Sequence, residues 1–148
     1  ICDRLDWLSF RPWPEAVLAE AALDTGTDPA EIRATLQSTL AMACQLSDPC
    51  WEAATCRVIA LSHQKEADMP SALRWFERAE QALSSVTDPY AALILRIRLD
   101  RVRIVLAQDR LAGQADLRAL VIDAARLYGD TELELALALR QSTGGARR

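Results

Sequence analysis

The chain has 148 residues, which suits one domain with a single sizeable core and no need of disulfide or metal support. Hydrophobic residues make up 51% and charged residues 26%, a balance that excludes an intrinsically disordered chain. The formal net charge of −4 excludes a global attraction for nucleic acid, although all basic residues except Lys65 are arginines.

The first residues, "ICDRLDWLSFRPW", have neither helical apolar spacing nor the pattern of a signal peptide. We therefore expect residues 1–13 to be irregular and, since Ile1 is not Met, the chain to be a fragment or a processed product. The longest uncharged run, residues 34–47, is shorter than the roughly 18 to 20 residues that cross a bilayer. Four cysteines without tight spacing favour reduced thiols, so we predict a cytoplasmic protein without a membrane segment.

Asp-Pro dipeptides occur at residues 28–29, 48–49 and 88–89, each before a segment with helical apolar spacing. Asp accepts hydrogen bonds from the unpaired N–H groups of a first helical turn, and Pro at the first position loses no hydrogen bond. Gly113 and Gly129 suit the ends of preceding helices. These boundaries predict seven helices, over residues 14–24, 29–46, 49–66, 70–86, 89–110, 114–128 and 130–142.

The segment "LRIRLDRV", residues 95–102, is the one serious strand candidate, because apolar and charged residues alternate over its first six positions. Arg101 and Val102 break the alternation. On a helix, Arg96, Asp100 and Arg103 form a narrow polar stripe with apolar residues around the rest of the circumference, as expected for an inner helix. We therefore predict a helix here and an all-α fold.

Residues 67–83, "ADMPSALRWFERAEQAL", resemble the second helix of a tetratricopeptide repeat (TPR). The resemblance rests on Ala72, Phe76 and Ala79, and reading backwards from them places the small residue of the first helix at Ala60. It implies that Ala60 and Ala72 let two helices approach, that Phe76 fills the space between hairpins, and that Ala79 admits the next helix. The aromatic residues usual in the first helix are replaced by cysteine and histidine.

This resemblance implies antiparallel helical hairpins stacked as a right-handed, TPR-like α-solenoid of about seven helices. Neighbouring units match the repeat pattern more loosely, and a repeat array needs about three units to bury its faces. We expect a single domain over residues 14–142, followed by a disordered tail at 143–148. Within this domain the expected hairpins cover residues 14–46, 49–86 and 89–128, with 130–142 as a capping helix.

A narrower resemblance spans about residues 10 to 141. The segments "FRPWPEAVLAEAAL", "DPCWEAATCRVIAL", "ALRWFERAE", "DPYAALILRIRLD" and "AARLYGDTELELALAL", in that order, are similar to the helical-repeat region of large bacterial transcriptional regulators. These are the signal-transducing ATPases, with their LuxR-type and antibiotic-regulator relatives. The chain has no GxxxxGK[ST] loop and no evident recognition helix, so the resemblance implies only the repeat region. Such a region would sense or relay, and other domains would act.

In tetratricopeptide repeats the first helices line a concave groove, and the resemblance implies the groove positions of this chain. An apolar floor bordered by arginine and lysine would suit an extended peptide or an acidic helix. The competing interpretation is a solvated edge of a purely structural repeat. The candidate groove residues are Arg57, Leu61, Gln64, Lys65, Leu99, Val102, Leu106 and Arg110.

The expected partner is a protein or peptide, which includes other domains of the same parent chain and a second copy in a homodimer. A self-association scaffold is the alternative function. Direct nucleic-acid binding is disfavoured, because the only basic cluster diverges around its helix and can pair with acidic neighbours such as Glu77 or Asp123. That cluster consists of Arg96, Arg98, Arg101 and Arg103.

Three of the four cysteines and the only histidine lie close together, as Cys44, Cys50, Cys56 and His63. Cys50 and Cys56 are six residues apart on one predicted helix, about 9 Å along its axis, so they cannot bind one metal ion together. Buried packing is the favoured interpretation for all four. A cysteine nucleophile would need His63 and a third orienting group, and no phosphate-binding loop is present. We therefore predict no enzymatic activity, metal or cofactor.

Overall fold

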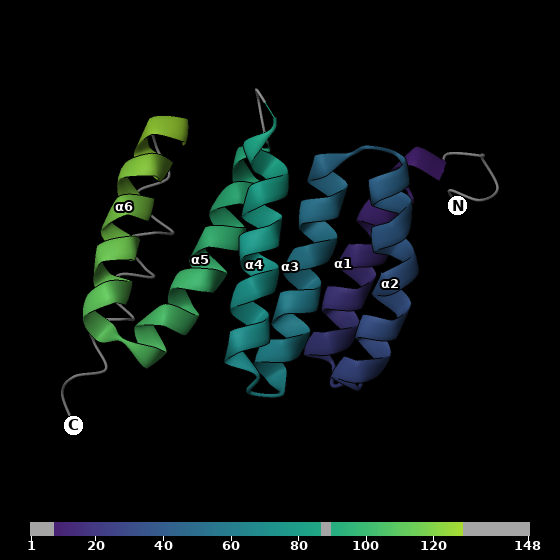
Figure 1. The fold of residues 1–148 in the computed structure, drawn as a ribbon, viewed down its shortest axis with the longest axis horizontal. Coiled ribbons are helices and arrows are strands. Elements are labelled where there is room, and N and C mark those ends of the chain that lie inside the picture. Colours follow the sequence, from purple (N-terminus) through teal and green to yellow (C-terminus); the bar gives the residue numbers. More distant parts are fainter. Residues whose placement is uncertain (1–7, 87–89, 129–148) are drawn as a thin grey trace. The chain divides into compact units, whose positions relative to one another are not determined.

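The computed structural model describes residues 8–86 and 90–128 (Figure 1). Within these ranges the chain is all-helical and contains no strand, which confirms the predicted class and the helical assignment of residues 95–102. A short 3₁₀ turn precedes six α-helices in the described part. The elements are η2 (Leu8–Phe10), α1 (Pro12–Asp24), α2 (Pro29–Gln45), α3 (Pro49–Lys65), α4 (Met69–Ser84), α5 (Ala91–Gln108) and α6 (Arg110–Tyr128).

Two of the three Asp-Pro dipeptides start helices as predicted. The Asp28 carboxylate accepts a hydrogen bond from the backbone N–H of Ala30 at the start of α2, with a distance of 2.9 Å. The Asp48 carboxylate accepts from Cys50 and Trp51 at the start of α3, at 3.0 and 3.1 Å. Each cap satisfies first-turn donors that have no partner within the helix. The third dipeptide lies outside the described residues.

The predicted boundary at Gly113 is wrong, because this glycine lies inside α6. The break falls at Asp109, whose carboxylate accepts from the backbone N–H groups of Leu111 and Ala112 at 2.9 and 3.1 Å. A Cβ atom at Gly113 would lie 2.6 Å from the backbone of Leu106. The glycine therefore permits a close approach between α5 and α6. The carboxylate of Asp109 caps the first turn of α6 and so marks where this helix begins.

Contacts divide the chain into two compact units, residues 1–97 and 98–148, with the boundary inside α5. In the first unit α1 packs on both α2 and α3, α2 also packs on α3, and α3 makes its most extensive contact with α4. Helices joined by these short turns run antiparallel (Figure 1). The central helix is α3, in which every residue from 53 to 60 is buried.

The α3–α4 hairpin, which has the most extensive helix contact of the first unit, buries several small residues completely. Ala60, Ala72, Phe76 and Ala79 each have 0% of their surface exposed. Alanine lets helix backbones approach, and the one large ring among them fills space that the alanines leave. Phe76 is accordingly the largest fully buried side chain of the described residues.

In the second unit, α6 buries Leu117, Leu120 and Ala124. The two helices of this unit are also joined by an ion pair, in which Arg98 Nη1 lies 2.8 Å from Asp123 Oδ2. The predicted capping helix and tail lie outside the described residues. None of the described helices is long and apolar enough to span a bilayer.

Of the N-terminal segment predicted to be irregular, residues 1–7 lie outside the described residues. The remainder departs from the prediction, because η2 covers Leu8–Phe10 and α1 begins at Pro12. Proline at a first helical position needs no hydrogen-bond acceptor, so this helix starts without a side-chain cap. The two prolines at positions 12 and 14 both fall within the first turn, where their missing N–H groups cost nothing.

Candidate binding site

Arg57 was predicted to face a groove, but it is only 7% exposed. Its Nη1 and Nη2 atoms donate to Oε2 and Oε1 of Glu20 on α1, each at 2.8 Å. The bidentate hydrogen bond to Arg57 holds the pKa of the Glu20 carboxyl below its usual value, against the opposing effect of burial. The prediction that Arg57 offers its charge to a partner's carboxylate is therefore wrong, because an internal carboxylate already occupies the guanidinium.

The other three groove candidates of the first unit lie along α3. Leu61 and Gln64 are half-buried, and Lys65 is exposed. Lys65 Nζ lies 3.6 Å from Asp24 Oδ1, and 51% of the lysine side chain and 70% of the aspartate side chain are exposed. A surface pair of this kind contributes little to stability, so Lys65 remains available to a partner.

The remaining groove candidates belong to the second unit. Leu99 and Leu106 are half-buried, and Arg110 is exposed. Val102 is 3% exposed, so it contributes to packing and does not lie on an open surface. Ile104, which lies nearly on the opposite side of α5, is buried as well, so burial here is not confined to one side of the helix.

The cysteine and histidine cluster of the sequence separates into different environments. Cys56 is fully buried, and burial raises the pKa of its thiol to about 12. Cys50 is half-buried, but Cys44 is exposed, which contradicts the expectation that it packs inside. His63 Nδ1 lies 3.3 Å from Asp68 Oδ2, an ion-pair distance, and makes no hydrogen bond within the described part. No group of three or more potential metal ligands occurs among the described residues.

Two arginines of the basic cluster on α5 pair with carboxylates. Arg98 pairs with Asp123, one of the two acidic partners predicted, and Arg103 Nη1 lies 3.0 Å from Asp100 Oδ1. Arg96 lies near enough to Glu20 to help lower the pKa of that carboxyl. Two of the four charges of this cluster are thus paired with carboxylates of the protein, which leaves less positive charge for a phosphate backbone.

An open recess of about 450 Å³ lies on the first unit, where the turn after α2 meets the first turn of α3 and the second half of α4. Sites of this volume accept ligands of the size of a few residues. Uncharged side chains form most of the wall, together with one arginine and one glutamate. The lining residues are Ser47, Pro49, Glu52, Arg78, Gln81, Ala82 and Ser85.

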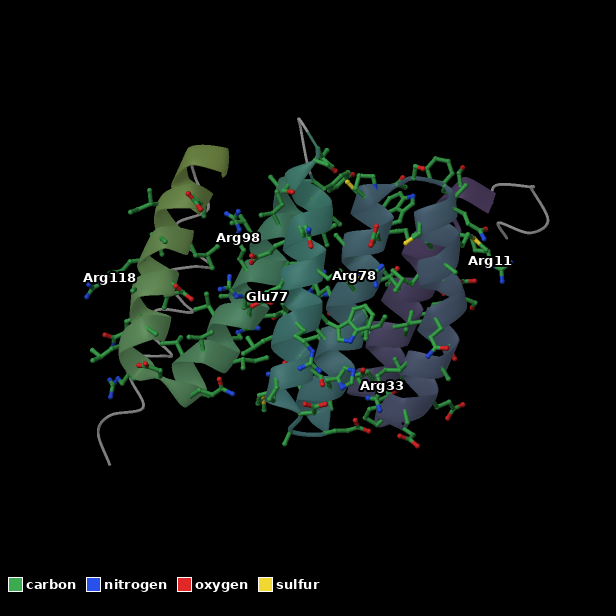
Figure 2. The ribbon with its side chains drawn as sticks, in the orientation of Figure 1. Arg11, Arg33, Glu77, Arg78, Arg98 and Arg118 are labelled. Carbon is green, nitrogen blue, oxygen red and sulfur yellow. The ribbon has the colours of Figure 1, made fainter. Side chains whose placement is uncertain are left out.

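Arg78 belongs to α4 (Figure 2), and side chains of three other residues contact its guanidinium. Its Nε and Nη2 atoms donate to Glu52 Oε1 at 3.1 and 2.9 Å, and this contact raises the pKa of the guanidinium. The guanidinium carbon lies 5.3 Å from the centre of the Trp75 ring, and Nη2 lies 3.8 Å from Cys44 Sγ. An arginine held in this way presents its remaining N–H groups at fixed positions.

Sequence reasoning missed this recess. The spacing of Trp75 and Arg78 places both on one side of α4, which indicates a stacked pair. The opposing Glu52 lies 26 residues earlier, and only the packing of α3 against α4 brings it to Arg78. No local pattern contains that information.

The first unit also exposes apolar side chains along α1. Val17 is 47% exposed and Leu18 is 68% exposed. Trp13, at the start of the same helix, is 38% exposed and contacts Trp51 of α3, with ring centres 5.2 Å apart. This side of α1 therefore presents apolar surface to solvent.

Comparisons with known proteins identify no relative. No protein-family model matches the chain, and neither a curated protein nor a solved structure matches it significantly.

Proposed function

We propose that this chain is a non-catalytic protein-binding or peptide-binding module, and that the recess beside Arg78 is its binding site. The observation that carries the proposal is a fixed guanidinium at an open concave surface. Arg78 is anchored by Glu52 and Trp75, and 43% of its side chain is exposed. Because its position is set before a ligand arrives, little conformational entropy is lost on binding.

The packing order of the first unit supports a TPR-like helical repeat as the scaffold of this module. Helix α1 contacts both its hairpin partner α2 and the next first helix α3, and α3 pairs in turn with α4. The alanines and the phenylalanine that carry the resemblance are buried in the second of these hairpins. Repeats that stack in this way present extended surfaces to proteins and peptides.

The similarity of several segments to the repeat region of bacterial signal-transducing regulators supports a place in such a protein. In this proposal the module lies in the cytoplasm and relays the presence of a bound protein or peptide to domains that act on transcription. The peptide occupies the recess, and α1 to α4 supply a rigid support for it.

Selection from a phage-displayed library of random peptides tests the proposal. We expect specific peptides to be enriched over a bare matrix, and Arg78→Ala to weaken their binding about tenfold, because a hydrogen bond to a charged donor is lost. Arg74→Ala is the matched control, since Arg74 is exposed on the same helix and donates to Ser71 outside the recess. Circular dichroism verifies that each variant is folded.

The proposal is wrong if the library yields no peptide above the bare matrix. The recess is not the binding site if the enriched peptides bind Arg78→Ala, and variants with any other substitution at the recess, as tightly as the wild-type protein.

Self-association is a second candidate function, favoured by the exposed apolar side of α1. Burial of Val17 and Leu18 against a second copy would remove apolar area from water. Sedimentation velocity over a range of concentrations should then show dimers that disappear in Leu18→Glu. A monomer at every concentration would exclude this candidate.

A further inference from the structure

The charges at the recess cancel. Arg78 and Glu52 are its only charged lining residues, and their side chains are 2.9 Å apart at the closest atoms. The five other lining residues are serine, proline, glutamine and alanine. A ligand carrying a net charge would therefore find one attractive and one repulsive group at nearly the same distance, so the wall favours neither sign.

The wall instead offers hydrogen bonds of both kinds. Both bonds from Arg78 to Glu52 start from Nε and Nη2, so the two N–H groups of Nη1 make no hydrogen bond within the described part of the chain. The Gln81 side chain is exposed and makes no hydrogen bond there either, so its amide can donate and accept. Ser85 donates its hydroxyl to the carbonyl of Ala82 at 3.0 Å and keeps acceptor capacity on its oxygen.

A peptide group has one N–H donor and one C=O acceptor, as do the carboxamides of asparagine and glutamine. This matches a wall with Nη1 of Arg78 as donor, the Ser85 oxygen as acceptor and Gln81 as both. A carboxylate would have no donor to match the acceptors, and it would also face Glu52. An ammonium group would face Arg78 and have no use for the free N–H groups.

We infer that the recess recognises an uncharged, extended peptide segment through its backbone amides or through an asparagine or glutamine side chain. The inference rests on the proposed function and names the ligand class for the same site. Of the two partners expected from the sequence, an extended peptide or an acidic helix, it favours the first, because the arginine of this site is already paired with a carboxylate of the protein.

The test uses the full chain and the peptide most enriched by the phage library, with titration calorimetry at low and high salt. We expect its dissociation constant to change less than about twofold between about 50 and 500 mM NaCl, since no net charge is paired. Gln81→Ala should weaken binding about fivefold, the effect of one lost hydrogen bond. Arg74→Ala should leave it within about twofold of the wild-type value.

A second comparison changes the peptide. Replacing its central asparagine or glutamine, or a residue next to the essential amide, with aspartate should weaken binding about tenfold, because a negative charge would then face Glu52. Glu52→Gln should remove most of this discrimination, and it retains the volume and planar shape of the side chain.

The inference is overturned if the enriched peptides are acidic and lose affinity severalfold at high salt, or if they bind equally well to Gln81→Ala and Arg78→Ala. In both cases the module would still bind peptides, so the proposed function would survive at least in part. A library that yields no peptide overturns the proposed function and this inference together.

Discussion

Two of the arginine–glutamate pairs that join neighbouring helices of the first unit differ mainly in exposure. Arg57 reaches Glu20 with 8% of the arginine side chain exposed, whereas Arg78 reaches Glu52 with 43% exposed. The first guanidinium uses both terminal nitrogens on its carboxylate, and the second leaves Nη1 free of hydrogen bonds in the described part. Burial and bonding geometry, and not residue type, therefore separate a structural pair from a pair that can serve a ligand.

The largest expected effect follows from breaking the buried pair. Glu20→Ala should lower the free energy of unfolding by about 3 kcal/mol, because the guanidinium of Arg57 stays buried without its bidentate carboxylate. Urea denaturation followed by circular dichroism measures this value. The double variant Glu20→Met with Arg57→Met should recover most of the loss, since apolar side chains of similar length can replace a buried pair.

If Glu20→Ala lowers the free energy of unfolding as little as a surface mutation does, the distinction between a buried structural pair and an exposed pair is wrong. A double variant that is less stable than the single one would show that the ion pair itself is needed.

The pH dependence of stability should identify the buried pair as well. The pKa of the Glu20 carboxyl is lowered by Arg57, so the unfolded chain binds a proton there more readily than the folded protein. The stabilisation is thus fully present above the unfolded pKa and is lost as the pH falls through the folded pKa, a window that lies below the usual pKa of a glutamate. Glu20→Gln should show a shallower loss of stability in that window, measured by urea denaturation at several pH values.

An equally steep profile for the wild-type protein and Glu20→Gln would assign the acid sensitivity to other groups. Asp68 is one such group, because its hydrogen bonds with Ser71 at the start of α4 also lower the pKa of its carboxyl.

A smaller effect is expected at the exposed pair. Arg78→Ala should lower the free energy of unfolding by less than about 1 kcal/mol, because water can solvate Glu52 and the stacking on Trp75 is partly exposed. Thermal or urea unfolding of this variant beside Glu20→Ala measures the contrast directly. A loss as large as that of Glu20→Ala would make Arg78 a structural residue and remove the basis for a binding role.

A gain in stability, of similar size to the loss expected for Arg78→Ala, is expected at two turns with left-handed backbone. Ser47 has φ of 53° and Ala67 has φ of 61°, a region that glycine occupies with less strain. Ser47→Gly and Ala67→Gly should each raise the free energy of unfolding by about 0.5 to 1 kcal/mol. Of these two residues, only Ser47 lines the recess. Ala67→Gly should therefore leave peptide binding unchanged, and it serves as the matched control when peptide binding to Ser47→Gly is measured. A loss of stability in both would show that the side chains contribute more than the strain.

The helix starts could be predicted from the sequence because a cap is a local interaction. Asp28 and Asp48 need only the backbone that follows them, and both cap as expected. The sequence did not predict the helix break at Asp109, because glycine is a stronger helix-end signal and Gly113 lies only four residues later. In the structure, Gly113 instead lets α6 approach Leu106 of the neighbouring helix. Local patterns cannot show which backbone will lie against a glycine.

The candidate site was predictable only in part. The resemblance to a tetratricopeptide repeat implied groove positions for Lys65 and Arg57. Lys65 is exposed, whereas the guanidinium of Arg57 is paired with Glu20 of another helix. The recess escaped prediction for the same reason, since Glu52 and Arg78 are joined by packing between helices.

The amino-acid sequence by itself determined an all-helical chain with helix starts at capping aspartates. These features depend on bonds within one turn or on periodic burial, which a sequence displays directly. The buried alanines of α3 and α4 were expected only because the segment resembles a tetratricopeptide repeat. Only the tertiary structure decided which arginine is buried with a carboxylate and which retains free donors at a recess. The physical reason is that desolvation and pairing depend on side chains from other helices, whose approach is set by the packing of the whole unit.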